Sequence, residues 1–147
     1  MAKFEVELPT EILKDIEFIY GNTKGIFGEM TTAGAKVAYE NIVRNAPAGM
    51  QQSAELMSCL KLTRVYETPS DNGINTKVLF SGYFTNENGV KTPAPLVANI
   101  FEYGRSDESL HGGIQKQPFL RRSFNKAQIT KAMLEAQKKA SGGLLDE

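Results

Sequence analysis

The sequence lacks most of the side chains on which metal sites and enzymes rely. Tryptophan is absent, and histidine and cysteine occur once each, as His111 and Cys59. A structural zinc site takes about four nitrogen or sulfur ligands, which these two residues do not supply. A single cysteine also excludes a disulfide within the chain. We therefore expect neither a metal nor any other cofactor.

The residues that nucleophilic catalysis needs are also scarce. A Ser–His–acid or Cys–His site needs a nucleophile, a base and an orienting acid in contact. His111 precedes Gly112 and Gly113 in a segment with the composition of a loop, which is a poor scaffold for catalytic geometry. Cys59 opens a predicted strand, where a small packed hydrophobe is the simpler interpretation. These features indicate a protein that is not an enzyme.

The chain has no excess charge of one sign and no long apolar run. Lys plus Arg and Asp plus Glu number 17 each, so the formal net charge is zero. Neutrality argues against a dedicated nucleic-acid binder, and it removes a repulsion that would oppose self-association. A basic-then-apolar leader and an apolar run of about 20 residues are both missing. We expect a protein made in the cytoplasm that has no membrane partner.

The length and composition are those of a single globular unit. A chain of 147 residues with 41% hydrophobic residues is expected to fold as one domain, residues 1–147. Residues 1–8 alternate between apolar and charged side chains, which predicts a short strand or an extended arm. Residues 141–147 form a tail, in which Leu144 and Leu145 are the candidate anchors for a neighbouring subunit.

Two helices are predicted before residue 48. Pro9 opens the first helix and Gly21 ends it, whereas Asn22 or Thr23 caps a longer second helix that Pro47 stops. Three glycines in this second helix cost about 1 kcal/mol each relative to alanine. Either another element packs closely against them, or the first turns are not helical. These glycines are Gly25, Gly28 and Gly34.

A small antiparallel sheet is predicted in the middle of the chain, after a polar link over residues 48–58 that has room for a short helical turn. Residues 59–68 and 74–84 alternate between apolar and polar side chains, and a turn-forming cluster separates them, which indicates a hairpin. A second turn at 86–89 predicts one more short strand. The fold class is therefore α+β: a small antiparallel sheet, made of a hairpin plus one or two short strands, packed against a long helix and a C-terminal helix.

Residues 92–104 predict a further helix, and Pro118 opens the last one. Gly104 occupies the position of a left-handed C-terminal cap, and residues 106–113 have the composition of a loop. The apolar face of the first of these helices is expected to hold Leu96, Val97, Ile100 and Phe101. That of the last helix is expected to hold Phe119, Leu120, Phe124, Ala127 and Leu134.

Glu102 is unusual because it lies in the last turn of its predicted helix. The helix macrodipole disfavours an acid there by about 0.3–1 kcal/mol. Arg121 and Arg122 open the next helix and are equally misplaced at its N-terminus. One interpretation is that Glu102 pairs with one of these arginines and clamps the two helix ends together. The alternative is that all three are solvated surface charges.

Four short motifs follow one another along the chain. They are Asn45-Ala-Pro47, Ser58-Cys-Leu-Lys61, Phe101-Glu-Tyr-Gly104 and Gln117-Pro-Phe-Leu-Arg121. In this order they resemble the HK97 gp10-like family of tailed-bacteriophage neck proteins, which are described as tail-completion or head–tail joining proteins. The resemblance covers residues 25–136.

The resemblance implies a structural protein of the virion, located at the neck where head and tail meet. Its partners would be other copies of itself, in a ring of sixfold or twelvefold symmetry, together with the adjacent head-connector and tail-tube or terminator proteins. The chain departs from the family at residues 48–57, which are longer than the usual Thr-Gly-x-Leu turn.

Three segments are the expected contact elements: the arm 1–8, the loop 105–117 and the tail 141–147. The residues that match the family pattern are expected to support the base of the loop and to take no catalytic role. The complete set of interface or loop-support candidates is Glu102, Tyr103, Arg105, Phe119, Arg121, Arg122, Leu144 and Leu145.

Two other functions remain open at this point. A tail terminator, or an accessory module that contacts packaged DNA in the channel, is the alternative to the joining role. Lys61, Arg64 and Lys77 on the hairpin form either a modest basic face for DNA or a mixed-charge solvated face. An enzyme is the third candidate, and a double substitution of His111 and Cys59 tests it.

Overall fold

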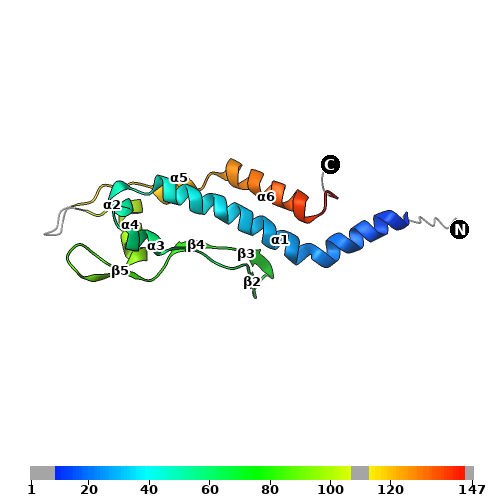
Figure 1. The fold of residues 1–147 in the computed structure, drawn as a ribbon, viewed down its shortest axis with the longest axis horizontal. Coiled ribbons are helices and arrows are strands. Elements are labelled where there is room, and N and C mark those ends of the chain that lie inside the picture. Colours follow the sequence, from blue (N-terminus) through cyan, green and yellow to red (C-terminus); the bar gives the residue numbers. More distant parts are fainter. Residues whose placement is uncertain (1–8, 107–112, 145–147) are drawn as a thin grey trace.

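The protein, seen here in a computed structural model that describes residues 9–106 and 113–144, is an elongated α+β molecule. A long helix, α1, runs along it, with α6 on one side and the strands on the other (Figure 1). The predicted fold class is confirmed. The helices are α1 (Thr10–Asn45), α2 (Ala48–Gln51), α3 (Ala54–Ser58), α4 (Ala94–Tyr103), α5 (Phe119–Ser123) and α6 (Lys126–Ala140). The strands are β1 (Leu60–Leu62), β2 (Tyr66–Thr68), β3 (Gly73–Asn75), β4 (Val78–Phe80), β5 (Tyr83–Thr85) and β6 (Lys91–Pro93).

The two predicted N-terminal helices are one continuous helix. At about 1.5 Å per residue, the 36 residues of α1 give a rod of about 54 Å. Asn22 and Thr23 do not cap a new helix, because their side chains donate hydrogen bonds to the carbonyls of Phe18 and Ile19, at 2.7 and 2.9 Å. Such bonds to the carbonyl four residues back are made inside a helix. Pro47 stops α1 as predicted, since the helix ends two residues before it.

The close packing expected against the glycines of α1 occurs at two of three positions. A Cβ atom at Gly34 would lie 2.9 Å from Cγ of Met133 and 3.1 Å from Cγ2 of Ile129, so α6 rests on this bare position. A Cβ atom at Gly28 would lie 3.5 Å from Val65. At Gly25 no described atom lies within 4 Å. The alternative, in which the first turns are not helical, is wrong.

Residues 48–58 are more than a polar link, because they contribute two side chains to the core, and the short helical turn predicted within them is confirmed. They form α2 and α3, and the side chains of Met50 and Leu56 are 0% and 2% exposed. Ser53 caps α3, where its hydroxyl accepts a hydrogen bond from the N–H of Leu56 at 3.2 Å. The apolar pattern is hard to see in the sequence because two buried residues are spread among glutamines and a glutamate.

The predicted hairpin is confirmed, although it is interrupted near its middle. β1 pairs with β4 and β2 pairs with β3, both antiparallel, with Leu60 opposite Phe80. Between the two pairs the N–H of Thr63 donates to the carbonyl of Lys77 at 2.9 Å, and the N–H of Lys77 donates to the Thr63 hydroxyl at 2.9 Å. The outer end of the hairpin reaches α1, where the hydroxyls of Thr76 and Thr31 lie 3.0 Å apart.

The further strand predicted after the second turn is also present. β6 pairs with β5, and the side-chain oxygen of Asn86 accepts hydrogen bonds from the N–H groups of Asn88 and Val90 in the turn between them. Gly82 has a φ of +88° just before β5. This positive φ kinks the chain at Gly82 and separates β4 from β5.

The apolar face predicted for α4 is correct only in part, because Val97 and Phe101 pack against the core but are only partly buried. Leu96 is 52% exposed, whereas the buried residues are Ala94, Ala98 and Glu102, at intervals of four. These most deeply buried positions hold two alanines and a glutamate, so the large apolar side chains of the sequence pattern mark only one edge of the buried face. The orientation of α4 is set by its packing against α5 and the strands β4 and β6.

The predicted last helix is divided into α5 and α6. The break lies at Phe124, and the side chain of Asn125 starts α6 by accepting a hydrogen bond from the N–H of Gln128 at 3.2 Å. Phe124 and Leu134 are 66% and 48% exposed, so the predicted apolar stripe is wrong beyond the break. The predicted stripe requires one continuous helix from Pro118. After the break, α6 is a separate helix that turns a different face to the core.

Two asparagines of α1 hold the junction between α5 and α6. The amide of Asn41, which is buried, donates to the carbonyl of Ser123 at 3.1 Å and to the side chain of Gln128 at 3.0 Å. Asn45 donates to the Ser123 hydroxyl at 3.1 Å. These bonds tie the break to α1, in addition to the bonds that Ser123 makes with the N–H of Asn125 and the carbonyl of Phe119. The main core lies between α1, the short helices and the hairpin, and comprises Ile42, Ala46, Met50, Leu56, Cys59, Leu60, Phe80, Phe84, Ala94, Ala98 and Phe119.

Candidate assembly interface

Gly104 ends α4 and turns the chain into the loop. Its φ is +78°, and its N–H donates to the carbonyl of Ile100 at 2.8 Å. A Cβ atom here would lie 2.8 Å from the carbonyl oxygen of Ile114 and 2.9 Å from the backbone nitrogen of Lys116. Only glycine combines this conformation with so little space. The glycine cap predicted at this position is confirmed in its positive φ, but its ψ of 176° places Gly104 outside the left-handed helical region.

The two flanks of the loop pair with each other as they leave the body of the protein. Arg105 and Ile114 form an antiparallel bridge, with N–H to carbonyl distances of 2.8 and 2.9 Å. Farther in, the N–H of Gln117 donates to the carbonyl of Phe101 at 2.7 Å. Residues 107–112, which include His111, lie outside the described part of the chain. The loop between the flanks is therefore closed at its base by backbone bonds.

Glu102 joins the end of α4 to the start of α5. Its side chain is 6% exposed, and its two oxygens accept hydrogen bonds from the N–H groups of Leu120 at 2.8 Å and Arg121 at 3.2 Å. The first N–H groups of a helix have no partner within the helix, so the carboxylate satisfies two of them. Its negative charge also lies at the positive end of the α5 dipole. The contact therefore stabilises both the buried carboxylate of Glu102 and the N-terminus of α5.

The clamp expected at Glu102 therefore exists, but its predicted partner is wrong. The carboxylate bonds to the backbone of Arg121, and the side chains of Arg121 and Arg122 are exposed. No ion pair joins Glu102 to either arginine. The solvated alternative describes the two arginines correctly and describes Glu102 wrongly. The unfavourable position of Glu102 in its own helix dipole marks it as unusual in the sequence. Its partners are backbone N–H groups, which residue type does not reveal.

Phe119 fixes α5 to the hairpin. It is 2% exposed, and its ring meets that of Phe80 edge to face, with centroids 6.3 Å apart and planes at 71°. Tyr103, by contrast, is 73% exposed, and Arg105 also lies at the surface. The predicted set therefore divides: Glu102 and Phe119 hold the loop base, while the side chains of Tyr103 and the three arginines surround it at the surface.

The start of the C-terminal tail is well anchored. Ser141 is fully buried, and the N–H of Gly143 donates to the carbonyl of Lys138 at 3.0 Å, which closes the end of α6. Leu144 follows and is 40% exposed. Leu145 and the predicted arm 1–8 lie outside the described residues. Their roles as contact elements stay predictions.

Sequence reasoning missed some residues that the loop base needs. Ile114 pairs with Arg105 and approaches Gly104, and Gln117 bonds to Phe101. Both contribute through their backbone, so their side chains carry no signal of the role. Gly104 is the one signal in the sequence, because glycine is often found where another backbone passes close to the chain.

Other residues considered from the sequence occupy ordinary positions. Cys59 is buried in the core, and Lys61, Arg64 and Lys77 are all exposed. Within residues 9–106 and 113–144, no group of three His, Cys, Asp or Glu side chains gathers as metal ligands would. No helix in the described ranges combines the length and the hydropathy needed to cross a membrane.

Comparison with known proteins gives no assignment. No family model, no curated protein and no solved structure matches the chain. The resemblance to phage neck proteins therefore rests on the four short sequence motifs alone and stays a prediction.

Proposed function

We propose that this protein is a structural subunit of a tailed-bacteriophage virion that joins head to tail, or completes the tail, as part of a ring at the neck. Its partners are further copies of itself in sixfold or twelvefold symmetry, the head connector on one side and the tail tube or terminator on the other. It is not an enzyme in this proposal, and it binds no cofactor.

The observation that carries the proposal is that two halves of the family-like motif bond to each other. Phe101-Glu-Tyr-Gly104 and Gln117-Pro-Phe-Leu-Arg121 are separated by the loop in the sequence. In the fold, Phe101 and Glu102 of the first half accept three hydrogen bonds from backbone N–H groups of the second. The motif thus has a physical purpose, which is to close and hold a loop. A loop held in this way suits a docking element in an assembly.

The arrangement of the ends supports the same function. The chain leaves α4 near one end of the elongated molecule, and the first turns of α1 form the other end (Figure 1). Contacts made by two different surfaces are heterologous, and such contacts close into rings when the rotation permits. A neutral protein with separate contact elements at its two ends is well suited to this kind of assembly.

The proposal is tested by electron microscopy of lysates from a phage that carries a null allele of the gene. Filled heads and complete tails of normal length that remain separate are expected. Joined, normal particles would contradict the neck role. Tails of abnormal length would instead favour a tail terminator, which is the second candidate.

A further inference from the structure

The first turns of α1 project beyond every other described element (Figure 1). All residues from 10 to 18 are exposed. The exposed side chains include several large apolar ones. They are Ile12, Leu13, Ile16 and Tyr20, with exposed fractions of 45%, 44%, 51% and 85%.

These apolar residues continue the face of α1 that already receives a helix. Ile16, Tyr20, Phe27 and Gly34 follow one another at steps of four and seven residues, so they lie on one side of α1. At Gly34 this side contacts α6 through Met133. α6 ends at Ala140, near Ile26 on α1, so the stripe runs on past the helix that covers it. The exposed part therefore has the character of a helix-packing surface.

The charges around this part of the stripe are mainly acidic. From Thr10 to Tyr20 there are three acids, Glu11, Asp15 and Glu17, and one base, Lys14. At 100° per residue, Asp15 and Glu17 fall on opposite sides of the stripe. A partner that covers it would bring basic groups to both borders.

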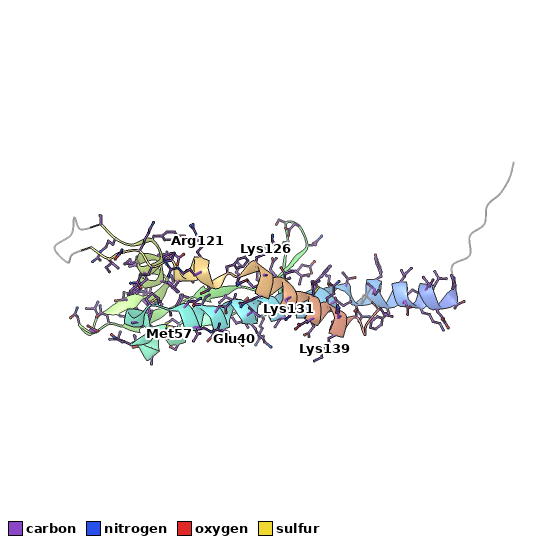
Figure 2. All side chains as sticks on the ribbon, turned by 90° about the horizontal axis from the view of Figure 1, so that it is seen from above. Glu40, Met57, Arg121, Lys126, Lys131 and Lys139 are labelled. Atoms are coloured by element: carbon purple, nitrogen blue, oxygen red, sulfur yellow. The ribbon has the colours of Figure 1, made fainter. Side chains whose placement is uncertain are left out.

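The outer face of α6 offers that combination. A shallow depression there is lined by Ala127, Thr130 and Leu134, of which Leu134 is 48% exposed. Its border holds three lysines, Lys126, Lys131 and Lys138, and one acid, Glu135. Lys126 and Lys131 lie along α6 in Figure 2. Between residues 121 and 140 the sequence has six basic residues and one acid. The apolar centre and basic border complement the stripe on α1.

The two surfaces cannot meet within one molecule, because α6 lies on α1 through Ile129 and Met133 and its outer face points away from that helix. We propose that the first turns of α1 in one copy pack on the outer face of α6 in a second copy. Ile12, Ile16 and Tyr20 then cover Leu134, while Asp15 and Glu17 approach Lys126 and Lys131. The contact is heterologous, so each copy has one surface of each kind free to continue the assembly. This inference deepens the proposed function by naming the self-association surface of the subunit.

Charge reversal on each side separately tests the contact. One variant carries Glu11→Lys, Asp15→Lys and Glu17→Lys, and the other carries Lys126→Glu and Lys131→Glu. Sedimentation velocity of the purified full chain over a dilution series at low salt should show association of the wild type and at least tenfold weaker association of each variant. An equimolar mixture of the two variants should associate again, because the lysines introduced on α1 of one variant then face the glutamates introduced on α6 of the other. Glu87→Lys, in an exposed turn remote from both surfaces, should behave as the wild type.

The reversed positions are exposed, so circular dichroism should show unchanged folding and melting in every variant. Ile16→Ser should also weaken association, through the apolar part of the contact. A wild type that stays monomeric, or a mixture that does not associate again, would overturn the proposal. Reversal on α6 that abolishes binding to a DNA duplex and leaves self-association intact would overturn it in favour of a nucleic-acid surface. A monomeric chain that still joins heads to tails would overturn this interface and leave the neck role standing.

Discussion

The carboxylate of Glu102 accepts a 2.8 Å hydrogen bond from the backbone N–H of Leu120, eighteen residues farther along the chain. This contact, with a second bond from the N–H of Arg121, connects the segment before the loop to the segment after it. The loop base is thus organised around one buried acid that acts on a helix N-terminus. Its strength is open to direct measurement.

Glu102→Gln should lower the free energy of unfolding by about 1–3 kcal/mol, the usual cost of leaving a buried hydrogen-bonding group without its partner. Glutamine presents one acceptor oxygen to two N–H groups, and its own NH₂ group would face the other. For a chain of this size, each 1 kcal/mol lowers Tm by about 2–4 °C. Thermal unfolding followed by circular dichroism measures the change.

The matched control for this prediction is Arg121→Ala. It removes an exposed guanidinium and keeps the backbone N–H that bonds to Glu102. Its effect on stability should stay within about 0.5 kcal/mol. If the arginine variant were as destabilised as the glutamate variant, the side-chain ion pair would be the true clamp.

Gly104→Ala should be clearly more destabilising than Gly89→Ala. Both glycines have positive φ, at +78° and +74°, so both substitutions pay the positive-φ penalty of about 1–2 kcal/mol. A Cβ atom at Gly89 meets no described atom within 4 Å, whereas at Gly104 it meets the backbone of Ile114 and Lys116. Urea unfolding of both variants gives the difference. Equal losses would show that the flanks of the loop are not packed as closely as described.

Gly34→Ala and Gly25→Ala should change stability in opposite directions. At Gly25 no described neighbour lies within 4 Å, so alanine should stabilise the helix interior by about 0.5–1 kcal/mol. At Gly34 the new methyl group would press on Met133 and Ile129, and overpacking of about 1–3 kcal/mol exceeds that gain. Denaturant midpoints of the two variants report the signs. Stabilisation by both would mean that α6 does not pack on α1 at this glycine.

Leu56→Ala should cost about 2–5 kcal/mol, because it empties a fully buried leucine site. Leu56 is 2% exposed, whereas Leu79, the control, is 38% exposed and should cost less when truncated. Chemical unfolding measures both values. A small loss at Leu56 would return residues 48–58 to the status of a surface link.

Some of this fold could be predicted because a local pattern fixes it. The hairpin follows from alternation and turn residues. The end of α1 follows from Pro47, whose ring restricts the backbone, and the end of α4 follows from Gly104, whose missing Cβ permits a positive φ. The continuity of α1 could not be predicted in the same way. Gly21 has the properties of a helix end, yet it lies inside α1. A Cβ atom added there would meet no described atom within 4 Å outside the local helix backbone, so no packing contact explains the glycine.

The candidate site was predicted in part for a comparable reason. Glu102 was noticeable because its charge is unfavourable where it lies in sequence. Its partners are backbone N–H groups, which every residue carries, so the sequence suggested the arginine side chains instead. Ile114 and Gln117 also act through their backbone. Tertiary contacts of this kind leave no trace in residue type.

The most direct test of the neck role is biochemical complementation. Purified protein is added to a lysate of the null phage, and infectious particles are counted before and after. The account predicts a large rise in titre, with heads and tails joined in the same sample. An unchanged titre, in a lysate shown to contain filled heads and complete tails, would contradict it.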